Sequence, residues 1–235
     1  MNEPLAINRF FNNLGRQFAY FYARRLLHSE INWEVELPVG AKVIAVNHPT
    51  TTDPFLLMSW PFEPIFILIT EDAFKVPGVG QFLHLAGHIP VYANRGREAF
   101  NTALNLLRNG QTVGIFPEGA LSQEDGQLVT AHSGAVRLAA AAKVPIVPVG
   151  IALDRHFVSS HQLNQFGVKE QMRWFCFGAY EVSAGKPLVC DHAADDQVAV
   201  TQSTGILMQE INLLKKRSAQ RLLDSSWPLT DLRLN

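Results

Sequence analysis

Cysteine is rare in this sequence, and neither sign of charge dominates it. Its 235 residues include only two cysteines, Cys176 and Cys190. That count is typical of a reducing compartment, and we expect both thiols to be buried as small apolar groups. The 20 Lys and Arg residues nearly balance the 21 Asp and Glu residues. A nucleic-acid-binding domain would carry a basic excess, so we expect no nucleic acid partner.

Long hydrophobic runs are also missing. No segment reaches the roughly 18 uncharged apolar residues expected of a membrane-spanning helix, since Glu63 and Glu71 interrupt the apolar stretches that follow Asp53. The start, from Met1 to Pro4, lacks the basic region and apolar run of a signal peptide. We therefore expect a cytoplasmic protein unless some segment tethers it to a membrane.

Residues 5–28 are the candidate tether. Aromatic and aliphatic side chains recur there at spacings of three and four, which predicts an amphipathic helix. Four arginines are interleaved with them, and Glu3 is the only acidic residue before Glu30. Such a composition is typical of helices that lie in the interface of an anionic membrane. The alternative is a terminal helix that packs on the domain and leaves its arginines in solvent.

The rest of the chain alternates between β-branched runs and helical patterns. Its 47% hydrophobic composition is enough for one sizeable core. No linker, repeat or low-complexity tract interrupts it, so we predict a single α/β domain with a mostly parallel or mixed sheet flanked by helices, plus the N-terminal amphipathic helix. Strands are predicted at 42–46, 65–69, 89–92, 113–116, 145–151 and 173–180, and helices at 55–60, 98–109, 133–143 and 197–223.

A histidine and a carboxylate bracket one short loop. The sequence Asn-His-Pro-Thr-Thr-Thr-Asp-Pro at 47–54 directly follows the first predicted strand. Pro49 disfavours a helical His48, so the histidine should be extended at the strand end. Pro54 suits the first turn of a helix and Asp53 suits its N-cap. The two side chains can meet if the loop folds back.

Such a pair has a defined chemistry. A carboxylate on one ring nitrogen orients the imidazole and stabilises the imidazolium formed when the other nitrogen takes a proton. This suits deprotonation of a hydroxyl on the substrate. Taken alone, the pattern has a plainer alternative, in which Asp53 caps a helix and His48 is an ordinary loop residue.

Three more motifs lie on predicted strands or at their ends, where open α/β sheets bind ligands. They are Gly-His-Ile-Pro-Val-Tyr at 87–92, Phe-Pro-Glu-Gly at 116–119 and Val-Pro-Ile-Val-Pro-Val-Gly at 144–150. With the loop at 47–54, these blocks resemble, in the same order, the four motifs of the glycerophospholipid (lysophosphatidate-type) acyltransferase family.

The resemblance implies an acyltransferase in which His48 deprotonates the acceptor hydroxyl and Asp53 orients His48. The acceptor oxygen then attacks the thioester of acyl-CoA or of an acyl carrier protein, with no other cofactor and no metal. The resemblance also places Glu118 and Gly119 in the acceptor site. It assigns five residues to the acyl-donor region, namely Val144, Pro145, Ile146, Val147 and Pro148.

The N-terminal pattern and the resemblance together predict two parts of the chain and its partners. Residues 1–30 form the amphipathic membrane-surface helix, and residues 31–235 form the acyltransferase domain. The implied partners are a membrane surface, a lysolipid acceptor and an acyl thioester donor. The implied location is the inner face of the membrane, as a peripheral protein.

This sequence departs from the family where the family carries basic residues. Phe-Pro-Glu-Gly is usually followed by Thr-Arg-Ser, and the arginine assigned to the acceptor phosphate is replaced here by Leu121. An arginine and a lysine near the second motif are also displaced or missing. Arg95, Arg97 and His132 are the candidates to replace them. Because a partly desolvated phosphate needs paired charge, these departures favour an acceptor less anionic than lysophosphatidate, such as another lysolipid, an aminolipid or a neutral hydroxyl.

Two other interpretations remain open at this stage. One is a catalytically silent lipid-binding or scaffold protein, against which the intact pair of His48 and Asp53 argues. The other is a thioesterase in which water replaces the acceptor. A metal site at His84 and His88 is not predicted, since no carboxylate or cysteine completes a ligand set there.

Overall fold

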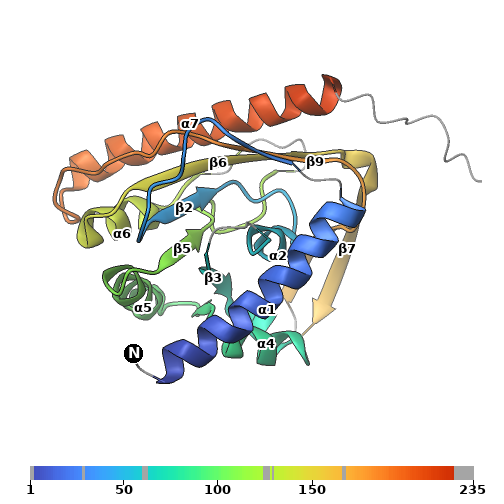
Figure 1. The fold of residues 1–235 in the computed structure, drawn as a ribbon, viewed down its shortest axis with the longest axis horizontal. Helices are drawn as coiled ribbons and strands as arrows, with labels where there is room; N and C mark the ends of the chain where they lie inside the picture. Colours follow the sequence, from blue (N-terminus) through green and yellow to red (C-terminus); the bar gives the residue numbers. More distant parts are fainter. Residues whose placement is uncertain are drawn as a thin grey trace, which may run out of the picture.

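A seven-stranded sheet forms the centre of the protein (Figure 1). The computed structural model describes residues 3–27, 30–59, 63–123, 128, 130–165 and 168–224. The strand order is β1-β9-β6-β2-β5-β3-β4, and neighbours run parallel except for the antiparallel pair β6 and β9. The strands are β1 (Glu30–Trp33), β2 (Val43–Val46), β3 (Ile65–Thr70), β4 (Ile89–Val91), β5 (Thr112–Ile115), β6 (Ile146–Leu153) and β9 (Tyr180–Ala184).

Helices cover both faces of this sheet, so the predicted α/β class is confirmed. One apolar core lies between the sheet and the helices α1 and α2, with α3 and α4 beside them. A second core lies between the other face and the helices α5, α6 and α7. The bounds are α1 (Glu3–Leu26), α2 (Asp53–Leu57), α3 (Glu71–Lys75), α4 (Val79–Leu85), α5 (Gly96–Arg108), α6 (Gly134–Ala142) and α7 (Gln197–Asp224).

Helix α7 packs along β6 and β9 (Figure 1). Its N-cap is Asp196, whose carboxylate accepts hydrogen bonds from two backbone N–H groups of the first turn. Gly150 in β6 permits the contact, since a Cβ there would lie 2.0 Å from the backbone nitrogen of Lys215. The long helix thus rests directly on the strand that ends beside the predicted site.

Helix α1 has one packed face and one exposed face. Asn12, Ala19 and Ala23 are buried against α2, α4 and the sheet, and the Asn12 side-chain amide donates to the carbonyl oxygens of Ile65 and Ala86. The opposite face exposes large apolar side chains at spacings of three and four, namely Ile7, Phe10, Leu14, Phe18 and Phe21, all more than half exposed. No helix in the described ranges is long and apolar enough to cross a bilayer.

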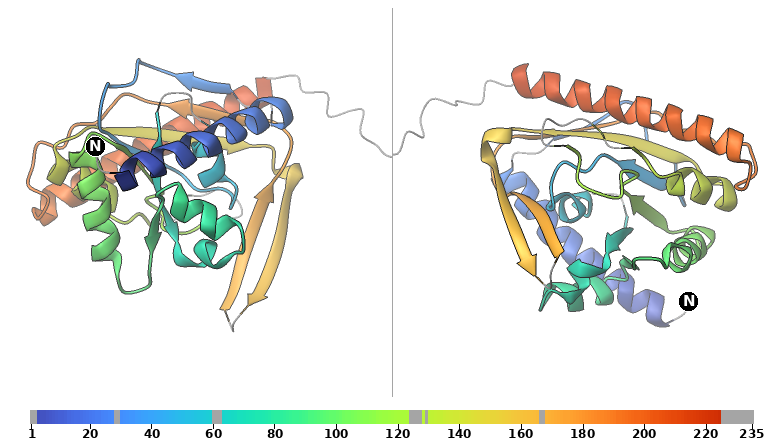
Figure 2. Two further views of the ribbon diagram at one scale, coloured as in Figure 1. Left: turned by 60° about the horizontal axis from the view of Figure 1, so that its bottom comes forward. Right: turned by 180° about the vertical axis from the view of Figure 1, so that it is seen from behind.

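A two-stranded hairpin, β7 (Val158–Gln165) and β8 (Val168–Phe175), projects from the body of the domain (Figure 2). The single strand predicted at 173–180 is wrong. The chain leaves the hairpin at Phe175, turns at Gly178 with φ 111°, and begins β9 at Tyr180. Only glycine suits that turn, since a Cβ at Gly178 would lie 2.8 Å from Phe157 Cδ2. Cys176 lies in this turn and is exposed, so the expectation of two buried thiols is also wrong; Cys190 is half-buried.

Candidate active site

The loop after β2 folds back and brings His48 against Asp53. The His48 Nδ1 atom lies 3.0 Å from Asp53 Oδ2. An ionised carboxylate only accepts hydrogen bonds, so Nδ1 carries the proton of this bond and Nε2 is left as the basic nitrogen. The Asp53 side chain is fully buried, whereas that of His48 is 16% exposed. The imidazole can therefore be approached from solvent while its carboxylate partner cannot.

The Asp53 carboxylate accepts hydrogen bonds from Thr50 and Tyr180 as well as from His48. Its Oδ2 atom accepts the Thr50 backbone N–H at 2.7 Å, and its Oδ1 atom accepts the Thr50 hydroxyl at 2.7 Å and the Tyr180 hydroxyl at 3.0 Å. Burial, and then the negative charge of Asp53, raise the pKa of Tyr180 well above its ordinary value, so this phenol remains a donor at physiological pH. Four hydrogen bonds, counting that from His48, stabilise the ionised carboxylate in a buried position.

The predicted N-cap role of Asp53 is wrong. Helix α2 begins at Asp53, its N-cap is Thr52, and Pro54 stands in the first turn as expected. The Asp53 carboxylate turns back toward Thr50 in the preceding loop rather than toward the helix N–H groups. Its position is thus explained by the histidine and the loop, with no contribution from capping.

Glu118 lies in the turn that follows the neighbouring strand β5 and contacts the His48 backbone. Its Oε1 atom accepts the His48 N–H at 2.8 Å and the Ser122 hydroxyl at 2.8 Å, and the residue is only 2% exposed. Ser122 in turn donates its backbone N–H to the His48 carbonyl at 2.8 Å. Phe116 stacks on the imidazole with ring centroids 4.2 Å apart. The Phe-Pro-Glu-Gly motif therefore fixes the ring and the backbone of the same histidine.

Gly119 and His132 lie against each other. Gly119 has φ 64°, and a Cβ on it would meet His132 Cδ2 at 2.8 Å. The His132 N–H donates to the carbonyl of Pro117 at 2.8 Å. These two acceptor-site candidates thus share one side of the turn that holds Glu118.

Arg95 and Arg97 lie farther away. They follow β4, which is separated from β2 by β5 and β3. Three strand spacings amount to roughly 14 Å, although both residues are at the same edge of the sheet as His48. Both are exposed, and the Arg95 guanidinium lies 5.9 Å from the centroid of the Tyr92 ring. Their acceptor-binding role stays a prediction.

The acyl-donor candidates lie at and before the start of β6. Ile146 and Val147 pair with Val43 and Ile44, at the far end of β2 from His48. Ile146, Val147 and Pro148 are buried, and Val144 and Pro145 are partly buried. Their contact with a donor stays a prediction. The carboxyl end of β6 reaches the site instead, since Asn47 forms hydrogen bonds to both the N–H and the carbonyl of Ile151, at 2.6 and 3.1 Å.

His88 has a structural environment. Its Nδ1 atom accepts the Ile67 N–H at 3.2 Å, and burial lowers its pKa to about 4. His84, by contrast, is exposed and lies against the Phe74 ring. Among the residues that the structure describes, no three His, Cys, Asp or Glu side chains form a group able to hold a metal ion.

His48, Asp53 and Glu118 of this site lie within a segment that matches a known protein family. The acyltransferase family model matches residues 28–152, more than half of the chain. The chain belongs to the acyltransferase family. The matched segment of this acyltransferase contains the His48 loop, the Phe-Pro-Glu-Gly turn and most of β6, so the resemblance inferred from the four motifs is confirmed.

Its relatives carry a common name. A 1-acyl-sn-glycerol-3-phosphate acyltransferase of Bacillus subtilis is 34% identical over 109 residues, covering 45% of this chain and 53% of the relative. One of Saccharomyces cerevisiae is 28% identical over 162 residues, covering 66% of this chain and 50% of the relative. The chain thus spans about half the length of these curated relatives.

A solved structure shares the fold. The crystal structure of the 1-acyl-sn-glycerophosphate (LPA) acyltransferase PlsC from Thermotoga maritima superposes with a TM-score of 0.60 over 95% of this chain and 82% of that one, at 18% identity. This likeness extends the fold assignment beyond the segment matched by the family model.

Proposed function

We propose that this protein transfers a fatty acyl group from a thioester donor to the free hydroxyl of a lysophospholipid, with His48 as the general base. The observation that carries the proposal is the contact of 3.0 Å between His48 Nδ1 and the fully buried Asp53 carboxylate, in a chain that belongs to the acyltransferase family. Relatives named as 1-acyl-sn-glycerol-3-phosphate acyltransferases make lysophosphatidate the first acceptor to test.

The chemistry requires two proton transfers and one acyl transfer. His48 Nε2 takes the proton of the acceptor hydroxyl as its oxygen attacks the thioester carbonyl carbon. The tetrahedral intermediate then expels the thiolate. The thiolate takes the proton from the imidazolium, and the products, an ester and a free thiol, leave. Asp53 stabilises the imidazolium between these steps and keeps Nε2 directed at the substrate. Glu118 holds the His48 backbone, so the ring keeps one position through the cycle.

A less anionic acceptor is the second candidate. Leu121 stands where the motif of lysophosphatidate-type acyltransferases has the arginine assigned to the acceptor phosphate. This replacement favours another lysolipid or a neutral hydroxyl as the acceptor. The two candidates share the same base and the same donor. They differ only in the charge that the acceptor site must neutralise.

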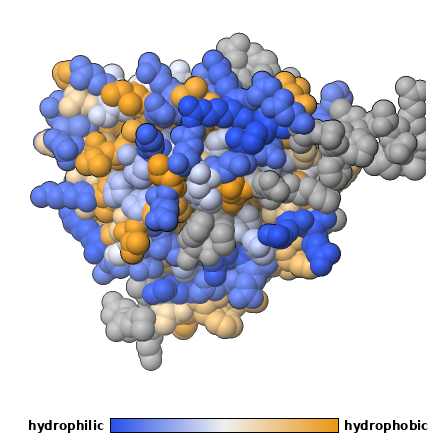
Figure 3. Space-filling view, turned by 45° about the horizontal axis from the view of Figure 1, so that its top comes forward, coloured by the Kyte–Doolittle hydropathy of each residue, from blue (hydrophilic) through white to orange (hydrophobic). Residues whose placement is uncertain are grey.

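We also propose that residues 1–30 are a membrane-surface unit and residues 31–235 the acyltransferase domain. The exposed stripe of α1 supports this, since Phe10, Phe18 and Phe21 are each more than 60% exposed. Arg24 and Arg25 lie over aromatic rings of the same helix, which suits an anionic lipid surface. The face shown in Figure 3 is, by contrast, mainly hydrophilic. The proposed location is the inner face of the membrane.

The enzymatic proposal is tested by thiol release from a long-chain acyl-CoA and from an acyl carrier protein. Wild type and His48→Ala are assayed with lysophosphatidate, neutral lysolipids and no acceptor. Release that requires both an acceptor and His48 supports the proposal and identifies the acceptor. Release without any acceptor indicates a thioesterase, and no release from either donor would contradict the proposal in favour of a silent lipid-binding protein.

The membrane proposal is tested by flotation with anionic lipid vesicles. Phe10→Ser and Phe18→Ser should each reduce the bound fraction. Ile206→Ser is the matched control, because Ile206 is an exposed apolar residue of α7. Equal binding by all four proteins would show that α1 does not form the contact.

A further inference from the structure

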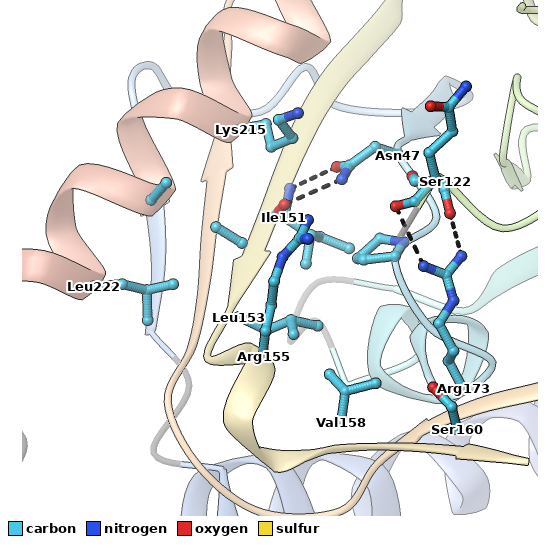
Figure 4. A pocket seen from close by; sticks show the side chains of 14 residues that line it. Asn47, Ser122, Ile151, Leu153, Arg155, Val158, Ser160, Arg173, Lys215 and Leu222 are labelled. Atoms are coloured by element: carbon cyan, nitrogen blue, oxygen red, sulfur yellow. Dashed lines mark hydrogen bonds between the residues drawn. The ribbon is translucent and has the colours of Figure 1, made fainter. Parts of the chain in front are cut away.

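A pocket of about 460 Å³ lies at the carboxyl end of β6, beside the His48 loop (Figure 4). Both sequence neighbours of His48, Asn47 and Pro49, line it, and so does Ser122, which donates its N–H to the His48 carbonyl. Its volume is in the range of small-molecule sites. The pocket is therefore next to the candidate catalytic residue, although His48 itself does not line it.

Three basic side chains reach this pocket from three separate elements. Arg155 follows β6, Arg173 belongs to β8, and Lys215 belongs to α7. Figure 4 shows Arg155 and Arg173 on opposite sides of the pocket, with Lys215 on the α7 side. No Asp or Glu is among the described residues that line it. The described lining therefore contains three basic side chains and no acidic one, in a protein whose overall charge is close to zero.

Arg173 is a fixed part of the pocket wall. It is only 8% exposed, and its guanidinium donates to the backbone carbonyls of Ser122 and Gln123. These two acceptors are neutral backbone carbonyls, and they fix the position of the guanidinium in the wall. Each of the three basic residues has further interactions in the chain, and an anion would join those contacts.

The remaining wall is largely apolar. Leu153 and Val158 line one part, and Ala219 and Leu222 of α7 line another. A pocket with positive groups and an apolar wall suits an amphiphile that carries an anionic group close to a hydrocarbon chain. A small inorganic anion would leave the apolar wall unused.

We propose that Arg155, Arg173 and Lys215 form a subsite for the phosphate groups of a substrate. The identity of the ligand rests on the proposed acyl transfer, in which two substrates carry phosphate: a lysophosphatidate-type acceptor and coenzyme A. The subsite supplies, from the segment after β6, from β8 and from α7, basic side chains where Leu121 provides none. Guanidinium and ammonium groups on separate elements also fix the orientation of a phosphate.

Equilibrium binding without turnover tests the subsite separately from catalysis. Calorimetric titrations use coenzyme A, lysophosphatidate and monoacylglycerol, the last as the counterpart without phosphate. The variants are Arg155→Gln and Lys215→Gln, because both side chains are more exposed than Arg173, which also supports the loop. Lys216→Gln is the matched control, since Lys216 is the next residue of the same helix and does not line the pocket.

We expect each variant to weaken binding of one phosphate-bearing ligand about tenfold, with the control and monoacylglycerol unchanged. A loss confined to coenzyme A identifies the donor, and one confined to lysophosphatidate identifies the acceptor. Wild-type affinity in both variants, an equal loss in Lys216→Gln, or no binding of either ligand by wild type would overturn the subsite. Because no acyl transfer is measured, a failure here is distinct from a failure of the proposed reaction.

Discussion

Replacing Asp53 with asparagine separates the proposed catalytic role of the carboxylate from its structural role. The Oδ2 position faces two N–H donors, from Thr50 and His48, and the Oδ1 position faces the hydroxyls of Thr50 and Tyr180. N–H groups cannot accept a hydrogen bond but hydroxyls can. The asparagine oxygen should therefore take the Oδ2 position, and its NH₂ group should donate to the two hydroxyls.

The stability cost follows from this rearrangement. All four hydrogen bonds survive, but each loses the charge of the carboxylate, which is worth about 1 kcal/mol per bond. We expect Asp53→Asn to lower the free energy of unfolding by about 2–4 kcal/mol and to keep the fold. Turnover should fall about 10²–10⁴-fold, because the imidazolium of His48 loses its counter-charge.

The assay pairs urea unfolding with thiol release at saturating acceptor. Asp196→Asn is the matched control, since Asp196 caps α7 through two backbone N–H bonds and asparagine caps a helix as well as aspartate does. That variant should change neither stability nor turnover appreciably. If Asp53→Asn kept wild-type turnover, the carboxylate would have no part in the reaction and the proposed mechanism would be refuted.

Three other substitutions test the surroundings of the site. Tyr180→Phe should lower the free energy of unfolding in urea by about 1–2 kcal/mol. It should lower turnover less than Asp53→Asn does, because only one hydrogen bond to the carboxylate is lost. A larger loss of turnover than in Asp53→Asn would contradict a supporting role for the phenol. The folded pKa of His88, about 4 against 6.5 for a free histidine, means that the unfolded chain takes up the proton first as pH falls. The contribution of His88 to the free energy of unfolding should therefore be constant above pH 7 and fall by about 2 kcal/mol at pH 5. His88→Gln should remove that part of the loss, and an unchanged pH dependence would refute the lowered pKa of His88. Gly150→Ala should cost about 2–4 kcal/mol in urea unfolding, since its Cβ would lie 2.0 Å from the Lys215 backbone nitrogen, and a neutral effect would show that α7 can shift freely.

Local patterns were enough to predict most of the regular elements. The β-branched runs gave β2, β3, β4, β5 and β6 to within a few residues, and the helical patterns gave α1, α5, α6 and α7. Each of these depends on its own periodicity and on a nearby turn residue, such as Gly110 after α5. The short helices α3 and α4 and the strands β1 and β7 are not predicted by the sequence, because four to eight mixed residues give no clear period.

The strand predicted across residues 173–180 shows where such patterns fail. Phe175 and Tyr180 are both buried apolar residues, so the sequence between them looks continuous. They belong to two different sheets, and the turn depends on Gly178. No local rule distinguishes a glycine inside a strand from one that ends it.

The order of motifs along the chain already determined the family and predicted the contact between His48 and Asp53, because both residues lie in one loop whose prolines restrict its backbone. Only the tertiary structure decided what surrounds them. Tyr180 reaches Asp53 from 127 residues away, and Arg155, Arg173 and Lys215 line one pocket from the segment after β6, from β8 and from α7. Such partners leave no local trace, since their contacts arise from the strand order of the sheet and from packing between elements, which sequence spacing does not encode.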